Sequence, residues 1–250
     1  MTRLLANKLT GWMMVFLLSI VSTEVWSTNT GSELVNAADK GNIPLVKKIL
    51  DTQRIDQEEL HAAFLAAVKK GHAAAVERFL QAGVDINLRA DDHYTPLMRS
   101  ARDGRDQAVE MLLAAGADVN AATDEDGTAL MLAAEKDRRK AIDLLLAAKA
   151  DVNAKRADSM TALMLAAQQG HRQVIQTLLN AGADVDYQLM NGATALMLAA
   201  QHGHLGAVHT LLAANANPNL KASNGATALT LAKLYHYKEV IELLIKAGAK

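Results

Sequence analysis

Apolar residues recur along the chain with the spacing of a helix. Between residues 76 and 245, six segments each carry apolar side chains at positions i, i+3 and i+4. The segments are Val76/Phe79/Leu80, Val109/Leu112/Leu113, Ile142/Leu145/Leu146, Ile175/Leu178/Leu179, Val208/Leu211/Leu212 and Ile241/Leu244/Ile245. Side chains with this spacing lie on one face of an α-helix. The pattern therefore predicts six short amphipathic helices.

A second helix is predicted ahead of most of these segments, beginning at a threonine. The threonines head Thr95-Pro96-Leu97-Met98, Thr128-Ala129-Leu130-Met131, Thr161-Ala162-Leu163-Met164, Thr194-Ala195-Leu196-Met197 and Thr227-Ala228-Leu229-Thr230. A threonine oxygen can accept a hydrogen bond from a free amide of the first turn, and proline is tolerated at the first helical position. Glycine readily takes the left-handed conformation that ends a helix. These helices are expected to end at Gly71, Gly104, Gly170 and Gly203.

The threonine segments follow one another at intervals of 33 residues. The same interval separates Gly116-Ala117-Asp118-Val119-Asn120, Lys149-Ala150-Asp151-Val152-Asn153, Gly182-Ala183-Asp184-Val185-Asp186 and Asn215-Ala216-Asn217-Pro218-Asn219. The pattern resembles that of the ankyrin repeat family, which carries T-P-L-H-x-A within a unit of about 33 residues. The resemblance covers about Ser32 to Lys250. It implies an all-α solenoid of antiparallel helix pairs, stacked in a curved row with projecting hairpin loops.

Seven repeats are expected within a domain of residues 28–250. Their predicted bounds are 32–56, 57–88, 89–121, 122–154, 155–187, 188–220 and 221–250. The first and last repeats have polar outer surfaces, which is typical of terminal repeats.

The chain departs from the family pattern in two ways. Methionine or threonine replaces the pattern's histidine, at Met98, Met131, Met164, Met197 and Thr230. We interpret the methionines as a core stripe; a soft-metal or oxidant-sensitive site is the alternative. The fourth repeat also lacks both helix-ending glycines, because Asp137 and Lys149 stand in their places. A left-handed non-glycine residue costs on the order of 1 kcal/mol, so this repeat is predicted to be the weakest joint.

Composition narrows the choice of partner. The 250 residues include 26 basic and 27 acidic side chains, a formal net charge of −1, which gives no reason to expect nucleic acid. The sequence has no cysteine, which excludes disulfides, thiolate metal sites and cysteine nucleophiles.

The first 27 residues are predicted to be a signal peptide. Arg3 and Lys8 precede an apolar run from Trp12 to Val21, which is shorter than the roughly 18 to 20 residues that span a bilayer. Small side chains before the cleavage site would place the mature start near Thr28. A cut after Ser22 and an uncleaved membrane tether are the alternatives. A periplasmic location is expected, with secretion as the second possibility and no membrane contact after cleavage.

The sequence carries no motif of a known catalytic or nucleotide-binding class, so no enzymatic activity and no cofactor are predicted. The densest histidine group, His202, His204 and His209, has no carboxylate spaced to complete a metal site. The acidic run 124–126 is interpreted as a solvated loop tip. His72, His171 and His204 each follow a helix-ending glycine, where the family resemblance implies hydrogen bonds between loops.

The resemblance further implies that a protein partner binds to the hairpin tips and to the exposed side of the first helix of each pair. The register then predicts the partner-binding residues Tyr94, Arg102, Asp103, Lys136, Met160, Gln168, Gln169, Tyr187, Leu189, Met190, Gln201, His202, Leu234 and Tyr235. This surface is charged in the early repeats, then rich in amides, then aromatic and apolar at its end. The tip 187–190 is unusually apolar, either because it contacts a partner or because Tyr187 and Leu189 fold back onto a neighbouring hairpin.

These observations predict a monomeric protein-binding module, acting as an adaptor or inhibitor of one protein partner. Neutralising a toxin and supporting an exported enzyme are two concrete forms of that function. The alternative is a metal- or redox-active periplasmic protein that uses the methionine and histidine positions.

Overall fold

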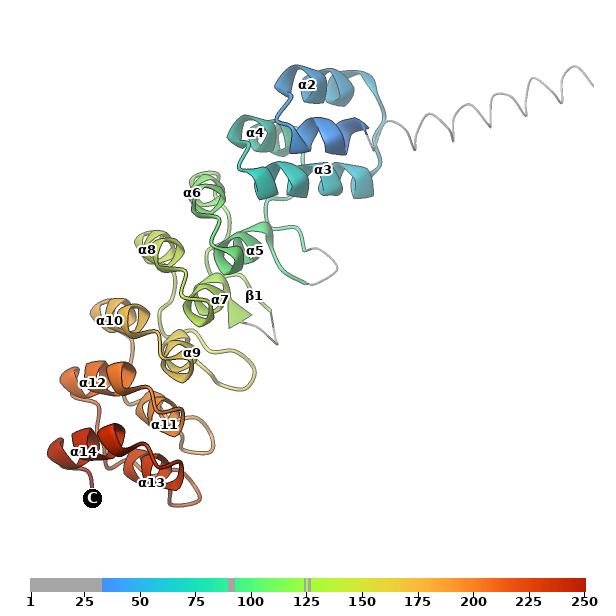
Figure 1. The fold of residues 1–250 in the computed structure, drawn as a ribbon. Helices are drawn as coiled ribbons and strands as arrows, with labels where there is room; N and C mark the ends of the chain where they lie inside the picture. The colour runs from blue at the N-terminus through green and yellow to red at the C-terminus, as the bar shows by residue number, and fades with distance from the viewer. Residues whose placement is uncertain (1–32, 90–92, 124, 126) are drawn as a thin grey trace, which may run out of the picture. The chain divides into compact units, whose positions relative to one another are not determined.

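The computed structural model describes residues 33–89, 93–123, 125 and 127–250, and they form helices that are arranged in pairs (Figure 1). The predicted signal peptide lies outside these residues, as do Asp124 and Asp126 of the acidic run. The chain divides into two compact parts, one ending at Asp85 and one comprising Ile86–Lys250.

In the N-terminal part, a helix over residues 33–39 precedes α2 (Ile43–Thr52), α3 (Gln57–Lys70) and α4 (Ala73–Gln81). The Asp56 carboxylate accepts a hydrogen bond from the Glu59 amide at 2.8 Å and so begins α3. Gly71, with φ of 75°, ends it. The α3 and α4 helices pack through Phe64 and Phe79, which are fully buried with their rings edge to face. Such aromatic pairs contribute more than their buried area alone.

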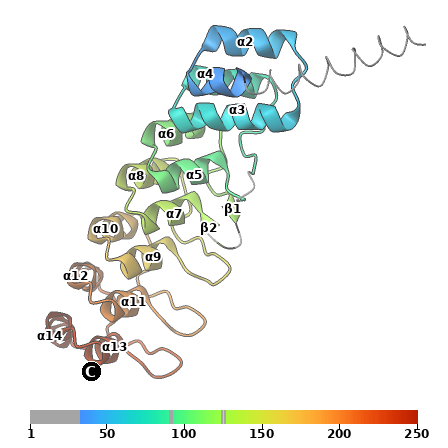
Figure 2. The same ribbon diagram turned by 45° about the vertical axis from the view of Figure 1, so that its right-hand side comes forward.

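The C-terminal part consists of stacked helix pairs in two layers (Figures 1 and 2). The inner layer contains α5 (Pro96–Asp103), α7 (Ala129–Glu135), α9 (Ala162–Gln169), α11 (Ala195–Gln201) and α13 (Ala228–Leu234). The outer layer contains α6 (Asp106–Ala114), α8 (Arg139–Ala147), α10 (Arg172–Asn180), α12 (Leu205–Ala213) and α14 (Lys238–Lys246). Loops project from the inner layer to one side, and before α7 one loop holds the antiparallel strands β1 (Ala122–Thr123) and β2 (Gly127–Thr128). The predicted all-α repeat solenoid is confirmed.

The threonines begin the inner helices, as predicted. Each Oγ1 accepts a hydrogen bond from the amide three residues later, at 3.2–3.4 Å, from Thr95 to Thr227. All five threonines are buried, so these bonds satisfy amides that water cannot reach. The hydroxyl therefore fixes where each inner helix starts.

The methionine stripe belongs to the core. Met98, Met131, Met164 and Met197 are each at most 3% exposed, which confirms the core interpretation. Their thioethers pack inside the stack, where a metal ion in solvent cannot reach them. Flexible thioethers fill this space in place of the histidine of the family pattern.

Side-chain oxygens in the loops after the outer helices join successive repeats. Asn87, Asn120, Asn153, Asp186 and Asn219 each accept a hydrogen bond from the backbone amide 31 residues later, at 2.8–2.9 Å. Because this hydrogen bond recurs with the repeat, it helps to fix the spacing of neighbouring helix pairs, in addition to the packing of their side chains.

Asp137 and Lys149 adopt the left-handed conformation that the missing glycines would have taken, with φ of 53° and 70°. Asn215 and His236 do the same in later repeats. At Asp137 the carboxylate is held by Arg139, whose Nε and Nη2 donate hydrogen bonds at 3.0 Å. The hydrogen bond from Arg139 keeps the pKa of Asp137 below its ordinary value. The Lys149 side chain is exposed, so a substitution to glycine there removes the backbone strain without removing a buried side chain.

We expect Lys149→Gly to raise the free energy of unfolding by up to about 1 kcal/mol, because glycine adopts a positive φ without steric cost. Chemical denaturation of the two proteins measures the difference. In the original chain, hydrogen exchange should show residues 122–154 opening before residues 155–187. If the fourth repeat opens after its neighbours, or Lys149→Gly is neutral, the strain does not limit stability there.

Candidate protein-binding surface

The two residues at the C-terminal end of each inner helix, counting the capping residue after α7, α11 and α13, reach the surface of the stack. They are Arg102/Asp103, Glu135/Lys136, Gln168/Gln169, Gln201/His202 and Leu234/Tyr235, all exposed or half-buried. The residues that precede them are mostly buried; in α9 every residue from Ala162 to Ala167 is. Successive inner helices pack side by side, so these positions align across the repeats. We call this aligned set the inner strip.

Most charges on the inner strip are paired within the chain. Asp103 contacts Arg102 at 3.2 Å and Arg105 at 3.0 Å, and the Lys136 ammonium lies 2.8 Å from Glu135. The Arg102 guanidinium also lies 4.9 Å from the centre of the Tyr94 ring, a cation–π distance. Exposed pairs of this kind stabilise little but neutralise the surface locally.

In the apolar tip 187–190, some side chains pack against the protein and others are exposed. Tyr187 and Leu189 are half-buried, and the Lys155 ammonium, from the hairpin loop before α9, lies 4.2 Å from the centre of the Tyr187 ring. Met190 is 95% exposed. The Gln188 side-chain amide donates to the carbonyls of Gly192 and Lys221, which braces the tip against the next loop. Of the predicted apolar contacts at this tip, Met190 is therefore the most accessible.

The prediction that Met160 contacts a partner is wrong, because its side chain is only 7% exposed. Asp158 accepts the Met160 amide at 2.9 Å, and the Met160 carbonyl accepts from the Arg156 amide at 3.2 Å. Arg156 in turn holds the Asp158 carboxylate at 2.7 Å, and this hydrogen bond lowers the pKa of Asp158. The closed turn directs the Met160 side chain into the stack.

Side chains at the turns inside the helix pairs tie each repeat to the one before it. The Nε2 atoms of His72, His171 and His204 lie 2.9–3.0 Å from backbone carbonyls of the preceding repeat, which confirms the predicted loop hydrogen bonds. Arg138, which was not predicted from the sequence, has the same role: its Nε donates a hydrogen bond to the Arg102 carbonyl at 3.0 Å. This bond also links the fourth repeat to the inner strip of the third.

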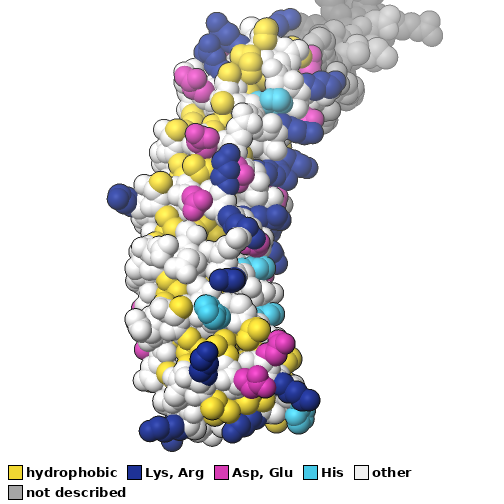
Figure 3. Space-filling view, turned by 60° about the vertical axis from the view of Figure 1, so that its left-hand side comes forward, with side chains coloured by type: hydrophobic (Ala, Val, Ile, Leu, Met, Phe, Trp, Pro, Cys, Tyr) yellow, Lys and Arg dark blue, Asp and Glu magenta, His cyan; other side chains and the backbone are white. Residues whose placement is uncertain are grey.

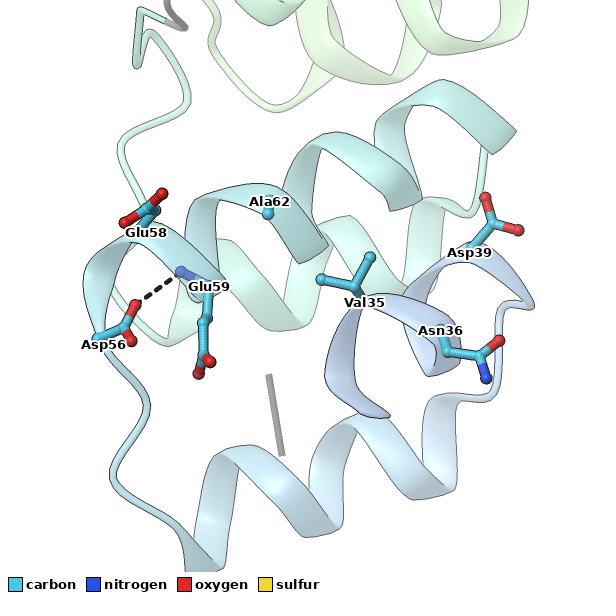
Figure 4. Close-up of a pocket in the computed structure, with 7 residues that line it drawn as sticks. All are labelled: Val35, Asn36, Asp39, Asp56, Glu58, Glu59 and Ala62. Carbon is cyan, nitrogen blue, oxygen red and sulfur yellow. Dashed lines mark hydrogen bonds between the residues drawn. The ribbon is translucent and has the colours of Figure 1, made fainter. Parts of the chain in front are cut away.

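The N-terminal part contains an open hollow of about 750 Å³ (Figure 4). It lies between the helix over residues 33–39 and α3, with Val35, Asn36 and Ala62 among its lining residues. Four carboxylates also line it, those of Asp39, Asp56, Glu58 and Glu59. Burial, followed by the neighbouring charges of Asp56 and Glu58, raises the pKa of Glu59. The Asp39 carboxylate lies 3.6 Å from the Lys70 ammonium. The hollow was not predicted from the sequence, because its lining residues do not recur in the other repeats.

A metal site would need several histidine or carboxylate side chains close together in the part of the chain that the structure describes. There, no group of three or more histidine, aspartate or glutamate side chains lies close enough to hold a metal ion. His202 and His204 stack on each other with ring centres 5.9 Å apart. Over the same residues, no helix has both the length and the apolar character needed to cross a bilayer.

Comparison with known proteins identifies the family. A family model described as ankyrin repeats in three copies matches residues 34–123, 115–189 and 163–250. A search of curated proteins finds no match. The matched segments together extend over nearly all of the described residues, and the structure shows the helix pairs that the family implies. The chain therefore belongs to the ankyrin repeat family, whose repeats generally form protein–protein interaction modules rather than enzymes.

Proposed function

We propose that the chain acts outside the cytoplasm as an adaptor or inhibitor of one protein partner, which binds along the inner strip and the adjoining hairpin tips. The observation that carries this proposal is the inner strip itself. Its positions are held in register by buried threonine caps and methionines, while the exposed side chains differ from one repeat to the next. A constant frame that presents varied side chains suits recognition of one surface, and function resides in such a site rather than in the fold.

The rigidity of the frame favours binding. Because neighbouring repeats are joined by hydrogen bonds in their loops and turns, little conformational entropy remains to be lost on docking. A complex of ordinary size buries about 1,600 Å² in total, which several adjacent repeats could supply.

Site-specific crosslinking tests the binding surface. A photoreactive amino acid at Gln169, on the inner strip, should crosslink to a single protein in cells. The same group at Gln173, which is exposed on outer helix α10, should give little product and serves as the matched control. Crosslinking of equal strength from both positions, or none from Gln169, Gln201 and Tyr235, would exclude the inner strip as the binding surface.

The apolar leader supports an extracytoplasmic location, with the periplasm preferred over secretion. Cell fractionation and the mass of the purified chain test this part of the proposal. We expect an extracytoplasmic form that begins near Thr28. A full-length chain recovered from the cytoplasm would contradict export while leaving the binding proposal intact.

Once the crosslinked partner is identified, its activity separates the two roles. An inhibitor lowers the activity of the partner in proportion to the complex formed, whereas an adaptor leaves it unchanged. Both need only a binding surface, so the assay must be made on the purified complex.

A further inference from the structure

Exposed apolar side chains gather over the last two repeats. The large apolar side chains most exposed among the described residues are Met190, Leu205, Leu234, Tyr235 and Ile245, and all of them follow residue 187. Figure 3 shows hydrophobic side chains among lysine, glutamate and histidine side chains at this end of the molecule. Clusters of exposed apolar side chains commonly mark interaction sites.

Packing does not require apolar residues at three of these positions. Leu234 and Tyr235 of the last repeat stand where the sixth repeat has Gln201 and His202. Leu205 of the sixth repeat stands where the fifth has Arg172. The polar equivalents are also exposed or half-buried, and their repeats fold in the same way. The choice of leucine and tyrosine therefore serves the surface rather than the core.

Ring contacts and a small hollow link Leu205, Tyr235 and Tyr237. The rings of Tyr235 and Tyr237 are stacked with their centres 6.3 Å apart. The Tyr237 ring covers Gly203 so closely that a Cβ there would lie 2.5 Å from it. Beside it is a hollow of about 300 Å³ whose lining includes Leu205, Tyr237 and Val240. We call the set Leu205, Leu234, Tyr235 and Tyr237 the aromatic patch.

Lysines outnumber acidic residues in the last two repeats. Residues 188–250 contain five lysines but only two acidic residues, Glu239 and Glu242. Lys233 directly precedes Leu234 and is exposed, and Lys238 lines the hollow together with Glu239. At the other end of the inner strip, by contrast, Arg102 and Lys136 are already paired with Asp103 and Glu135. Next to the apolar side chains, Lys233 and Lys238 therefore outnumber the single carboxylate of Glu239.

We propose that the aromatic patch binds an acidic segment of a protein, with one aromatic or aliphatic side chain of that segment entering the hollow beside Tyr237. The inference rests on the proposed function and specifies the chemistry of the partner. The apolar anchor provides the affinity, as at most interface hot spots, and the lysines select an acidic context and speed association.

Selection from a library of short random peptides, displayed on phage and applied to the immobilised full chain, tests this chemistry. The selected peptides should share acidic residues flanking a large apolar side chain. The best peptide, labelled and titrated in solution, should bind about tenfold more weakly to Lys233→Ala/Leu234→Gln/Tyr235→His. This variant copies Ala200-Gln201-His202 of the preceding repeat, so it keeps a sequence that the fold already accommodates. Higher salt should weaken binding to the original chain.

The matched control is Gln173→Ala/Gln176→Ala, at two exposed positions of outer helix α10 outside the inner strip, and it should leave the peptide affinity unchanged. Selected peptides without acidic residues, equal affinity for the patch variant, or no enrichment at all would each overturn the inference. The proposed function has its own test in crosslinking from Gln169. A partner captured there, together with failure of the peptide selection, would therefore refute the patch alone.

Discussion

Gly170→Ala is expected to lower the free energy of unfolding by about 2–3 kcal/mol. Gly170 has φ of +75°, and a Cβ at this position would lie 2.7 Å from the His204 ring. The left-handed backbone alone costs an alanine about 1 kcal/mol. His204 must also move away, and its bond to the Gln168 carbonyl at 2.9 Å would then be lost. Losing that bond is worth on the order of 1 kcal/mol, with any unsatisfied carbonyl adding to it.

Gly182→Ala provides the matched control. Gly182 has φ of +92°, but a Cβ there would meet nothing within 4 Å. Only the backbone strain of about 1 kcal/mol should therefore remain. Urea denaturation followed by circular dichroism compares the two variants. Equal losses would show that the contact of His204 with the glycine contributes nothing to the joint between the fifth and sixth repeats.

The same contacts explain how much of the fold the sequence predicts. Threonine caps, helix-ending glycines and the methionine stripe recur every 33 residues. Once the helices of one repeat are assigned, those of the other repeats follow. The hydrogen bonds of the histidines that follow helix-ending glycines could likewise be predicted, from the family resemblance. The role of Arg138 could not be predicted, because an arginine at the start of a helix does not by itself indicate a hydrogen bond to the preceding repeat. The distance to the Arg102 carbonyl was needed.

The exposure of candidate site residues could be predicted from helix periodicity where they lie on helices. It could not be predicted where they lie in loops, whose conformation the periodicity does not determine. Positions on the inner strip follow from the period, since the last turn of each inner helix faces solvent. Met160 was misplaced because its orientation depends on a turn closed by Asp158 and Arg156. The acidic hollow was missed because α3, at 14 residues, differs from the shorter helices of the repeating pattern. Features shared by all repeats can be predicted from the pattern, but features of one repeat require coordinates.

Leu178→Ala is expected to lower the free energy of unfolding by about 3 kcal/mol or more, since it leaves a cavity among helices that cannot close fully around it. Leu178 is fully buried on α10, which packs against α8, α9 and α12. In a stack where each repeat contacts only its neighbours, damage to an internal repeat weakens both of its interfaces. Hydrogen exchange should therefore accelerate in the fourth, fifth and sixth repeats together.

Leu244→Ala removes the same number of atoms from an equally buried site, but its helix α14 packs against α12 and α13 of the last two repeats. The loss should appear as early opening of residues 221–250, with the protection of residues 122–187 unchanged. Because Leu234, Tyr235 and Tyr237 lie in that last repeat, peptide binding to the aromatic patch should fall in Leu244→Ala even where the rest of the stack stays folded. If both variants instead unfold the whole C-terminal part in one step, the repeats are coupled more strongly than nearest-neighbour packing provides. The aromatic patch would then share the stability of the entire part rather than that of its own repeat.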